Sequence, residues 1–300
     1  MTLKTIHIDE SDHLNRLDKV ITKKDETMTR TAIKHLIEEA YILVNDEETK
    51  PSYKVKTGDV ITIKEKIIEP LTITPVDLDL EFIYEDDDLI VVNKPSGLVV
   101  HPSHTVKEAT LVHGILAQAN VEDDASLRPG IVHRIDKETS GLLVVAKNKD
   151  TLLALQSELK ARKTEREYIA LVEGVIPHNN GKIDAPIGRD TKDRKLMSVT
   201  EKGKASITYF RVLERFDEHT LVACKLESGR THQIRVHMQY IKHPIVGDPK
   251  YGHKKTDTTY GQYLHAESLG FTHPKTKEFM TFKAPLPEFF ISKLESLRKS

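Results

Sequence analysis

The chain has 300 residues, of which 38% are hydrophobic and 30% charged, and its formal net charge is −1. These values fit a soluble globular protein of about two domains, each long enough to bury a core. No apolar run approaches the ~18 residues of a membrane span, and the opening MTLKTIHIDESDH lacks the apolar segment of a signal peptide. The single cysteine, Cys224, excludes an internal disulfide, and we expect a cytoplasmic protein.

Charge is distributed unevenly along the chain. Residues 1–70 carry 12 basic and 14 acidic side chains, residues 71–90 carry 7 acidic and no basic ones, and residues 91–300 carry 33 basic and 25 acidic ones. We therefore predict an N-terminal domain at 1–70, an acidic linker with a first strand at 71–90, and a basic domain at 91–300. Moderate basicity permits nucleic-acid binding, although surface charge also serves solubility.

The first 70 residues have the pattern of a small α/β module. Ile33, Leu36 and Ile37 recur at helical spacing after Thr31, a candidate N-cap. A second helix is expected near RLDKVITKK. The elements expected after the helices are a strand at 41–44, a turn at 45–48 and a strand at 59–63.

The remaining sequence predicts a mixture of strands and helices. Residues 81–100 indicate two strands around an acidic turn, and Leu152, Leu155 and Leu159 share one face of a helix. Further strands, rich in β-branched and aromatic residues, are expected at 142–146, 167–176, 205–216 and 219–229. Because these strands do not alternate regularly with helices, we expect an α+β fold with a mainly antiparallel sheet.

Several familiar functional motifs are missing from the sequence. There is no HExxH and no cysteine pair, and His232 and His237 are five apart, so we expect no metal site. Neither GxGxxG nor GxxxxGKS/T occurs, so we expect no nucleotide cofactor, and there is no GxSxG of a serine hydrolase. Ser140 is interpreted as a turn residue and Cys224 as a buried structural residue.

Three polar clusters remain, and each adjoins an expected strand. RPGIVHRIDKETSG contains Arg128, His133, Arg134 and Asp136; REYIALVEG contains Tyr168; and ESGRTHQIRVH contains Arg230, His232, Gln233 and Arg235. Each cluster alone has a structural explanation, such as a turn cap, a half-buried aromatic or a surface charge. Together they indicate a pocket for a flat heterocycle, because an arginine favours a charged carboxylate and an aromatic ring offers a stacking face.

These clusters, in this order, resemble those of the RNA pseudouridine synthases of the RluA family, in the subgroup with an N-terminal S4 domain. The resemblance also includes VVNKPSGLVVHPS, GKASITYF, HPIVGDPKYG and LHAESLGFTHPKT. The first 70 residues resemble the S4 domain, a small RNA-binding fold, through RLD at 16–18, Thr29-Arg30 and KTGD at 56–59. Ala40 and Asp46 depart from this pattern, which usually has glycine at both positions.

The resemblance implies an isomerase that converts uridine in RNA to pseudouridine without a cofactor. It implies that Asp136 is the catalytic residue and that Arg134 helps to open the site around the target base. It also implies that Tyr168 stacks on the uracil and that Arg230 pairs with Asp136. The other residues expected to contact RNA are Arg16, Arg30, Lys34, Arg128 and His133.

Several alternatives stay open at this point. Asp136 could attack C1′ or C6, or remove a proton from C2′, and residue types do not choose between these routes. Ribosomal RNA is the expected substrate because S4-bearing members of the family mostly act there, with transfer RNA as the alternative. The chain could also be a non-catalytic RNA-binding or ribosome-assembly protein. A glycosidase-like hydrolase would need a second acid, for which Glu138 is the nearest candidate.

Overall fold

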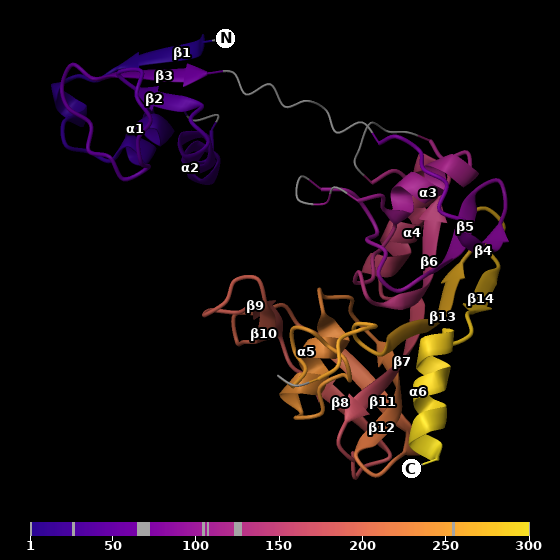
Figure 1. Ribbon diagram of the computed structural model, residues 1–300. Helices are drawn as coiled ribbons and strands as arrows, with labels where there is room; N and C mark the ends of the chain where they lie inside the picture. The colour runs from indigo at the N-terminus through magenta and orange to yellow at the C-terminus, as the bar shows by residue number, and fades with distance from the viewer. Residues whose placement is uncertain are drawn as a thin grey trace. The chain divides into compact units, whose positions relative to one another are not determined.

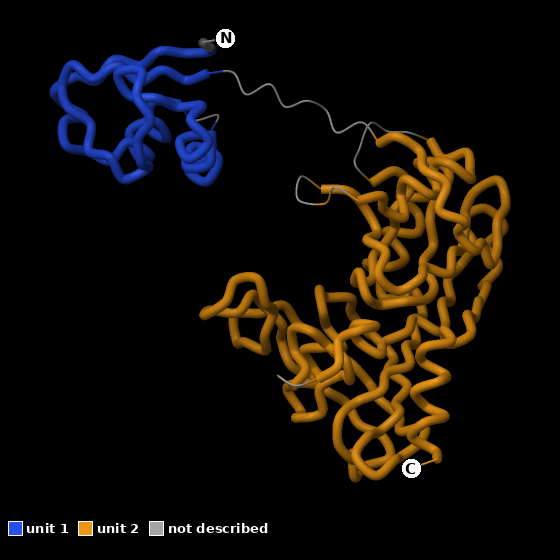
Figure 2. The backbone as a smooth tube through the Cα atoms, in the orientation of Figure 1, with its two compact units in different colours: residues 1–71 blue, residues 72–300 orange. Residues whose placement is uncertain are grey.

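The computed structural model describes residues 2–25, 28–64, 73–103, 106, 108–122, 128–253 and 256–299. Two compact units are present, residues 1–71 and residues 72–300, which we call the N-terminal unit and the C-terminal unit (Figure 2). The start of the expected linker, residues 71 and 72, lies outside the described residues. None of the described helices has the length and apolar character needed to cross a membrane.

The N-terminal unit is a three-stranded antiparallel sheet packed against two helices (Figure 1). In sheet order the strands are β1 (Thr2–His7), β3 (Val60–Lys64) and β2 (Ile42–Val44). A 3-10 turn at Glu10–Asp12 precedes the helices α1 (Leu17–Lys24) and α2 (Arg30–Glu38). The expected helix at Ile33 and Ile37 is confirmed, and both side chains are buried in the core of this unit.

The N-cap of α2 differs from the expected one. Thr29 is extended, and its hydroxyl accepts a hydrogen bond of 3.3 Å from the backbone amide of Ala32. Thr31 lies inside the first turn and cannot serve as the cap, because a capping residue must precede the helical residues. The prediction of Thr31 as the N-cap is therefore wrong.

The C-terminal unit is built around one nine-stranded sheet. In sheet order its strands are β4 (Glu81–Glu85), β5 (Leu89–Lys94), β6 (Ser140–Ala146), β13 (Leu264–Thr272), β7 (Glu165–Glu173), β12 (His219–Leu226), β11 (Ile207–Arg215) and β8 (Asn180–Asp184), with β14 (Phe279–Lys283) also paired to β13. Of these pairings, β6 with β13 is parallel and the others are antiparallel. The expected α+β fold with a mainly antiparallel sheet is confirmed.

Smaller elements complete this unit (Figure 1). They are the hairpin of β9 (Ile187–Arg189) and β10 (Met197–Val199) and the helices α3 (Leu111–Gln118), α4 (Lys149–Lys160), α5 (Gln233–Tyr240) and α6 (Glu288–Arg298). The sequence pattern predicted α4, but α3, α5 and α6 were not among the expected elements. Helix α5 follows directly from the ESGRTH segment, so it carries part of the third polar cluster.

Strand β6 is buried along its whole length. Because strand side chains alternate between faces, Leu143 and Val145 enter one core while Leu142 and Val144 enter another. Helix α4 covers the second of these faces through Leu155. Two covered faces explain why β6 is a continuous apolar run.

Gly141 permits the parallel pairing of β6 with β13. Its φ is +108°, and a Cβ atom there would lie 2.3 Å from the carbonyl oxygen of Ala266 on β13. Any side chain would therefore separate the two strands at the point where they begin to pair. Beside it, Ser140 is the first residue of β6, so its interpretation as a turn residue is wrong. Its hydroxyl lies 2.9 Å from Nδ1 of His265 and joins the same two strands.

Candidate active site

A pocket of about 510 Å³ lies where the loop before β6 meets β7, the end of β12 and α5. Its lining includes Asp136, Arg134, Tyr168 and Arg230, so these four residues of the expected site share one cavity. They come from chain segments almost 100 positions apart. The sheet order brings them together, because only β13 separates β6 from β7.

The loop that carries Asp136 is anchored on both sides. The Lys94 ammonium is fully buried and donates to the carbonyl oxygens of Pro95, Leu98 and Lys137, at 2.7, 2.9 and 2.9 Å. Burial lowers the pKa of Lys94 to about 7. The Ser96 hydroxyl donates to the carbonyl of Glu138 at 2.8 Å. These bonds hold the backbone that follows Asp136, so Lys94 is a structural residue that the sequence analysis did not single out.

His133 anchors the other side of this loop. Its Nε2 accepts a hydrogen bond of 3.3 Å from the backbone amide of Val144 on β6. Burial, with a smaller effect of the Arg166 charge, lowers the pKa of His133 to about 3. The ring is therefore neutral near pH 7 and is bonded to β6; it also lines the pocket, and its expected contact with RNA stays a prediction.

Asp136 is held by an arginine of helix α5. Nη1 of Arg235 donates to Oδ2 of Asp136 at 2.7 Å, and the Asp136 side chain keeps 18% of its surface exposed. Nε and Nη2 of Arg235 donate to the two oxygens of buried Asp248, at 2.7 and 2.8 Å. We call these three residues the Arg235 cluster. Arg235 is fixed by the two hydrogen bonds that it donates to Asp248, so its third hydrogen bond holds Asp136 in one orientation.

The expected ion pair between Arg230 and Asp136 is wrong. Arg230 precedes α5, where its backbone amide donates to Oε1 of Gln233 and its Nε lies 3.4 Å from the carbonyl of Ala205. Arg235 lies inside the helix, is buried, and faces the carboxylate. GRTHQIR offers two arginines, and the start of the helix at Gln233 decides which one reaches Asp136. Arg230 still lines the pocket.

His232 lies on the other side of Asp136. It has a left-handed backbone conformation, with φ of 57°, at the N-cap position of α5. Its Nδ1 is 2.8 Å from the Tyr251 hydroxyl, and its Nε2 is 3.9 Å from Oδ1 of Asp136. Burial lowers the pKa of His232 to about 4, so the ring is neutral near pH 7. His232 belongs to the third polar cluster of the sequence and lines the pocket, but its position beside Asp136 was not among the expected features.

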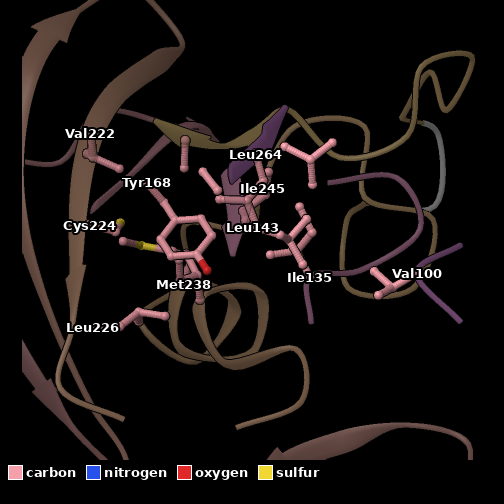
Figure 3. Close-up of a cluster of buried hydrophobic side chains, with 14 of the residues drawn as sticks. Val100, Ile135, Leu143, Tyr168, Val222, Cys224, Leu226, Met238, Ile245 and Leu264 are labelled. Atoms are coloured by element: carbon pink, nitrogen blue, oxygen red, sulfur yellow. The ribbon is translucent and has the colours of Figure 1, made fainter. Parts of the chain in front are cut away.

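Tyr168 forms one wall of the pocket from strand β7. It is 6% exposed and packs among apolar side chains that include Cys224, its neighbour across the β7–β12 pair (Figure 3). Burial raises the pKa of Tyr168. No described residue hydrogen-bonds its hydroxyl, so this ring is held by packing alone. Burial also raises the pKa of the Cys224 thiol, in keeping with its structural interpretation.

Arg134 and Arg128 differ in their relation to the pocket. Both are exposed, and Arg134 lines the cavity, two residues before Asp136. Arg128 is outside the lining. An exposed guanidinium at the rim can move toward a bound nucleotide at little cost, because its charge stays hydrated when the pocket is empty.

In the N-terminal unit, two of the expected RNA-binding residues meet at one carboxylate. Nε of Arg16 and Nη2 of Arg30 donate to the two oxygens of Asp18, at 3.0 and 2.8 Å. The Asp18 side chain is fully buried, while those of Arg16 and Arg30 are 40% and 45% exposed. Hydrogen bonds from Arg16, and next from Arg30, lower the pKa of Asp18 to about 2. We call these residues the Asp18 cluster; exposed Lys34 follows on α2, one turn after Arg30.

A paired-carboxylate hydrolase is disfavoured by the lining of this pocket. Glu138 is not part of it, and the two lining carboxylates are Asp136 and Glu227. Glu227 is ion-paired with Arg162 and accepts a bond from Tyr209, so it is not available as a general acid. Asp248 shares Arg235 with Asp136 but is buried and is not part of the lining, so the described lining offers no unpaired second carboxylate for such a reaction.

One cluster in the described chain has the spacing of a metal site, namely Asp86, Asp88 and His273. Nε2 of His273 lies 2.9 Å from Oδ2 of Asp86, and its Nδ1 accepts bonds from the amides of Lys275 and Thr276. Both ring nitrogens are thus used within the protein. The cluster fastens the loop after β13 to the turn between β4 and β5.

Comparison with known proteins identifies the family of this chain. The family model for RNA pseudouridylate synthases matches residues 88–240, and the S4 domain model matches residues 15–61. The chain is 47% identical to the uncharacterized RNA pseudouridine synthase YlyB of Bacillus subtilis over 97% of both chains. It is 42% identical to the ribosomal large subunit pseudouridine synthase D of Neisseria meningitidis serogroup A, over 94% of this chain and 79% of that one.

A solved structure has a similar fold. Human RNA Pseudouridylate Synthase Domain Containing 1 has a TM-score of 0.58 at 27% identity and covers 78% of this chain and 98% of that one. The matching models, the relatives and the fold agree with the motifs from which the family was inferred. The chain belongs to the RNA pseudouridylate synthase family and is an RNA pseudouridine synthase with an N-terminal S4 domain.

Proposed function

We propose that this enzyme isomerises uridines of large-subunit ribosomal RNA and that Asp136 carries out the reaction. The observation that supports the catalytic assignment is the Arg235 cluster, which fixes one Asp136 oxygen while the carboxylate stays open to the pocket. The substrate class rests on relatives named ribosomal large subunit pseudouridine synthase D at about 40% identity. We also propose a cytoplasmic enzyme, since ribosomal RNA is handled there.

Asp136 acts through the oxygen that Arg235 does not bind. Oδ2 is occupied by Nη1 of Arg235, so Oδ1 meets the ribose or the uracil. Attack at C1′, attack at C6 and removal of a C2′ proton all begin from this oxygen. Arg235 is a positioning residue, because it acts on the substrate only through the carboxylate that it orients.

Tyr168 holds the uracil while the glycosidic bond is broken. The uracil must leave C1′, rotate and return through C5, and a stacking surface keeps it from diffusing away. The rigid packing of Tyr168 suits this role because the ring loses no further mobility when uracil binds. Arg134 at the rim fills the position that the base leaves when it is extracted from its stack, a step that costs a few kcal/mol.

The N-terminal unit binds RNA outside the pocket. The half-exposed guanidinium groups of the Asp18 cluster and the ammonium of Lys34 face phosphates of the same RNA. Asp18 holds the two arginines close together in advance, which reduces the entropy lost on binding. This role explains how a domain with more acidic than basic residues can still bind RNA.

Pseudouridine mapping tests the proposed function. Ribosomal and transfer RNA from cells with and without the protein are treated with carbodiimide, and reverse-transcription stops are compared. We expect stops in large-subunit RNA that vanish without the protein and return with the wild-type chain but not with Asp136→Asn. Stops lost only from transfer RNA would contradict the substrate class, and unchanged stops in all RNAs would favour a non-catalytic RNA-binding protein.

A further inference from the structure

The lining of the active-site pocket carries more positive than negative charge. Six cationic side chains and two carboxylates line it: Arg134, Lys160, Arg162, Arg166, Arg230 and Arg235, with Asp136 and Glu227. Each carboxylate already has an arginine partner, Arg235 for Asp136 and Arg162 for Glu227. The remaining cations therefore have no acidic partner within the lining.

Among the lining cations that have no acidic partner in the pocket, Arg166 is buried. It is only 8% exposed, and its Nε is buried without a hydrogen-bond partner. No hydrogen bond or ion pair joins its guanidinium to any other residue in the described part of the chain. A buried guanidinium without an anion is strongly unfavourable, so a group of this kind calls for a partner from outside the protein.

The position of Arg166 places this charge beside the uracil site. Arg166 and Tyr168 are two residues apart on β7, and burial alternates along this segment, so both side chains face the pocket. Residues two apart on a strand are about 7 Å from each other. That spacing is similar to the separation of a base from the phosphate of its own nucleotide.

Gly229 gives the guanidinium its space. A Cβ atom at position 229 would lie 2.6 Å from Nη1 of Arg166. The loop after β12 therefore lies close to the guanidinium, and Gly229 and Arg166 both line the pocket. Because the atom in the way is the end of a flexible side chain, an alanine here would displace Arg166 without disrupting the backbone.

We propose that Arg166 binds a phosphodiester group attached to the target uridine, so that it and Tyr168 hold the two ends of one nucleotide. This inference rests on the proposed function. The phosphate is the charged group of an RNA nucleotide, and its two free oxygens match the paired N–H donors of a guanidinium. Binding satisfies the buried charge only when a nucleotide is in the pocket.

Neutral phosphate analogues provide the test. The probe is a stem-loop of large-subunit RNA around a mapped target uridine, with one methylphosphonate on the 5′ or the 3′ side of that uridine. The nucleotide before each neutral linkage is 2′-deoxy, both in the probe and in its charged reference. In the wild-type protein, we expect one neutral linkage to weaken binding about tenfold, as for loss of one charge-assisted hydrogen bond. In Arg166→Gln the same neutral linkage should weaken binding less than twofold.

Two further variants sharpen this test. Arg162→Gln removes a pocket arginine that is already paired with Glu227. In that variant the neutral linkage should still weaken binding about tenfold, and we call this loss of affinity the penalty. Gly229→Ala keeps every charge but displaces the guanidinium, so it should reduce the penalty. It also provides a readout if Arg166→Gln does not fold, as judged by thermal melting.

Two results would overturn the assignment of Arg166. One is a wild-type protein that binds both neutral linkages as tightly as their charged references. The other is an equal penalty in the wild type and in Arg166→Gln. Conversion of the unmodified stem-loop to pseudouridine is measured in parallel. If the wild type forms no pseudouridine there, the proposed function fails. If it forms pseudouridine but the effect of the neutral linkage does not depend on Arg166, only the role of Arg166 is refuted.

Discussion

The N-terminal and C-terminal units each contain a cluster of three charged side chains, with the signs reversed. In the Asp18 cluster a buried carboxylate joins two half-exposed arginines, which gives a formal excess of one positive charge. In the Arg235 cluster a buried arginine joins two aspartates, which gives a formal excess of one negative charge. In both clusters the middle residue is buried. Both outer arginines of the Asp18 cluster are exposed, whereas in the Arg235 cluster only Asp136 keeps exposed surface.

This difference separates two tasks of the enzyme. An exposed pair of guanidinium groups suits phosphates, which need positive charge and bidentate donors. A half-buried carboxylate on a rigid arginine suits chemistry, which needs one atom held in place. The account therefore assigns RNA affinity to the Asp18 cluster and turnover to the Arg235 cluster, and each assignment can be broken separately.

The largest expected effect is that of Asp136→Asn. The amide keeps the size of the side chain but removes the nucleophile or base, so turnover should fall by at least ~10³-fold. Affinity for the RNA should stay within several-fold, because phosphate contacts supply most of it. Rapid-quench assays and filter binding measure the two quantities, and a variant that lost affinity but kept its turnover would reverse the assignment.

A smaller loss is expected when Arg235 is changed. Arg235→Lys keeps the charge but cannot bond both aspartates, so misplacement of Asp136 should cost about 10²-fold in turnover. Arg230→Gln is the matched control from the same segment, and because Arg230 does not bond Asp136, its single-turnover rate at saturating RNA should fall much less than that of Arg235→Lys. The reverse pattern would restore Arg230 as the partner.

The Asp18 cluster should affect binding rather than turnover. Replacing both Arg16 and Arg30 by Gln should weaken RNA binding about tenfold and reduce the slope of log K against log salt by about 0.7 for each lost contact on single-stranded RNA. Turnover at saturating RNA should not change. Lys4→Gln, at an ion pair with Asp25, is the control for loss of charge elsewhere in this unit. An unchanged slope in the double variant would show that the cluster does not face RNA.

The last prediction concerns stability, and neither turnover nor RNA binding is measured. The pKa of Asp18 is lowered to about 2 by its arginines, whereas its ordinary value is 3.8. Its contribution to folding is therefore complete above about pH 4 and is lost as the pH falls toward 2. Asp18→Asn should destabilise the N-terminal unit by about 2 kcal/mol at neutral pH. Thermal melting between pH 2 and 7 should show that the melting temperatures of the two proteins converge in acid. A difference that does not change with pH would show that the charge of Asp18 does not stabilise this unit.

The sequence was sufficient for features that depend on local pattern or on motif residues. The strand at 142–146 follows from its apolar run, and the motif spacing led to Asp136 and Tyr168 before the pocket was known. The sequence alone did not decide whether Arg230 or Arg235 pairs with Asp136. This choice depends on where α5 begins and on a carboxylate, Asp248, that reaches Arg235 from a later loop.

The contacts of Lys94 and His133 could not be predicted either, because their partners lie in other segments of the chain. Lys94 is followed by a Pro-Gly loop in the sequence, yet one of its three carbonyl partners belongs to Lys137, 43 positions away. His133 stands beside the catalytic motif, but its partner is a backbone amide of β6. Such contacts depend on how separate segments pack, and residue types alone do not specify that packing.

The most direct test of the division of tasks is the single-turnover rate at saturating RNA. Wild type, Asp136→Asn and the Arg16→Gln, Arg30→Gln double variant are compared on the same stem-loop of large-subunit RNA. The account predicts wild-type rate for the double variant and less than about 0.1% of that rate for Asp136→Asn. A rate above about 1% in Asp136→Asn, or a slow double variant at saturation, would contradict it.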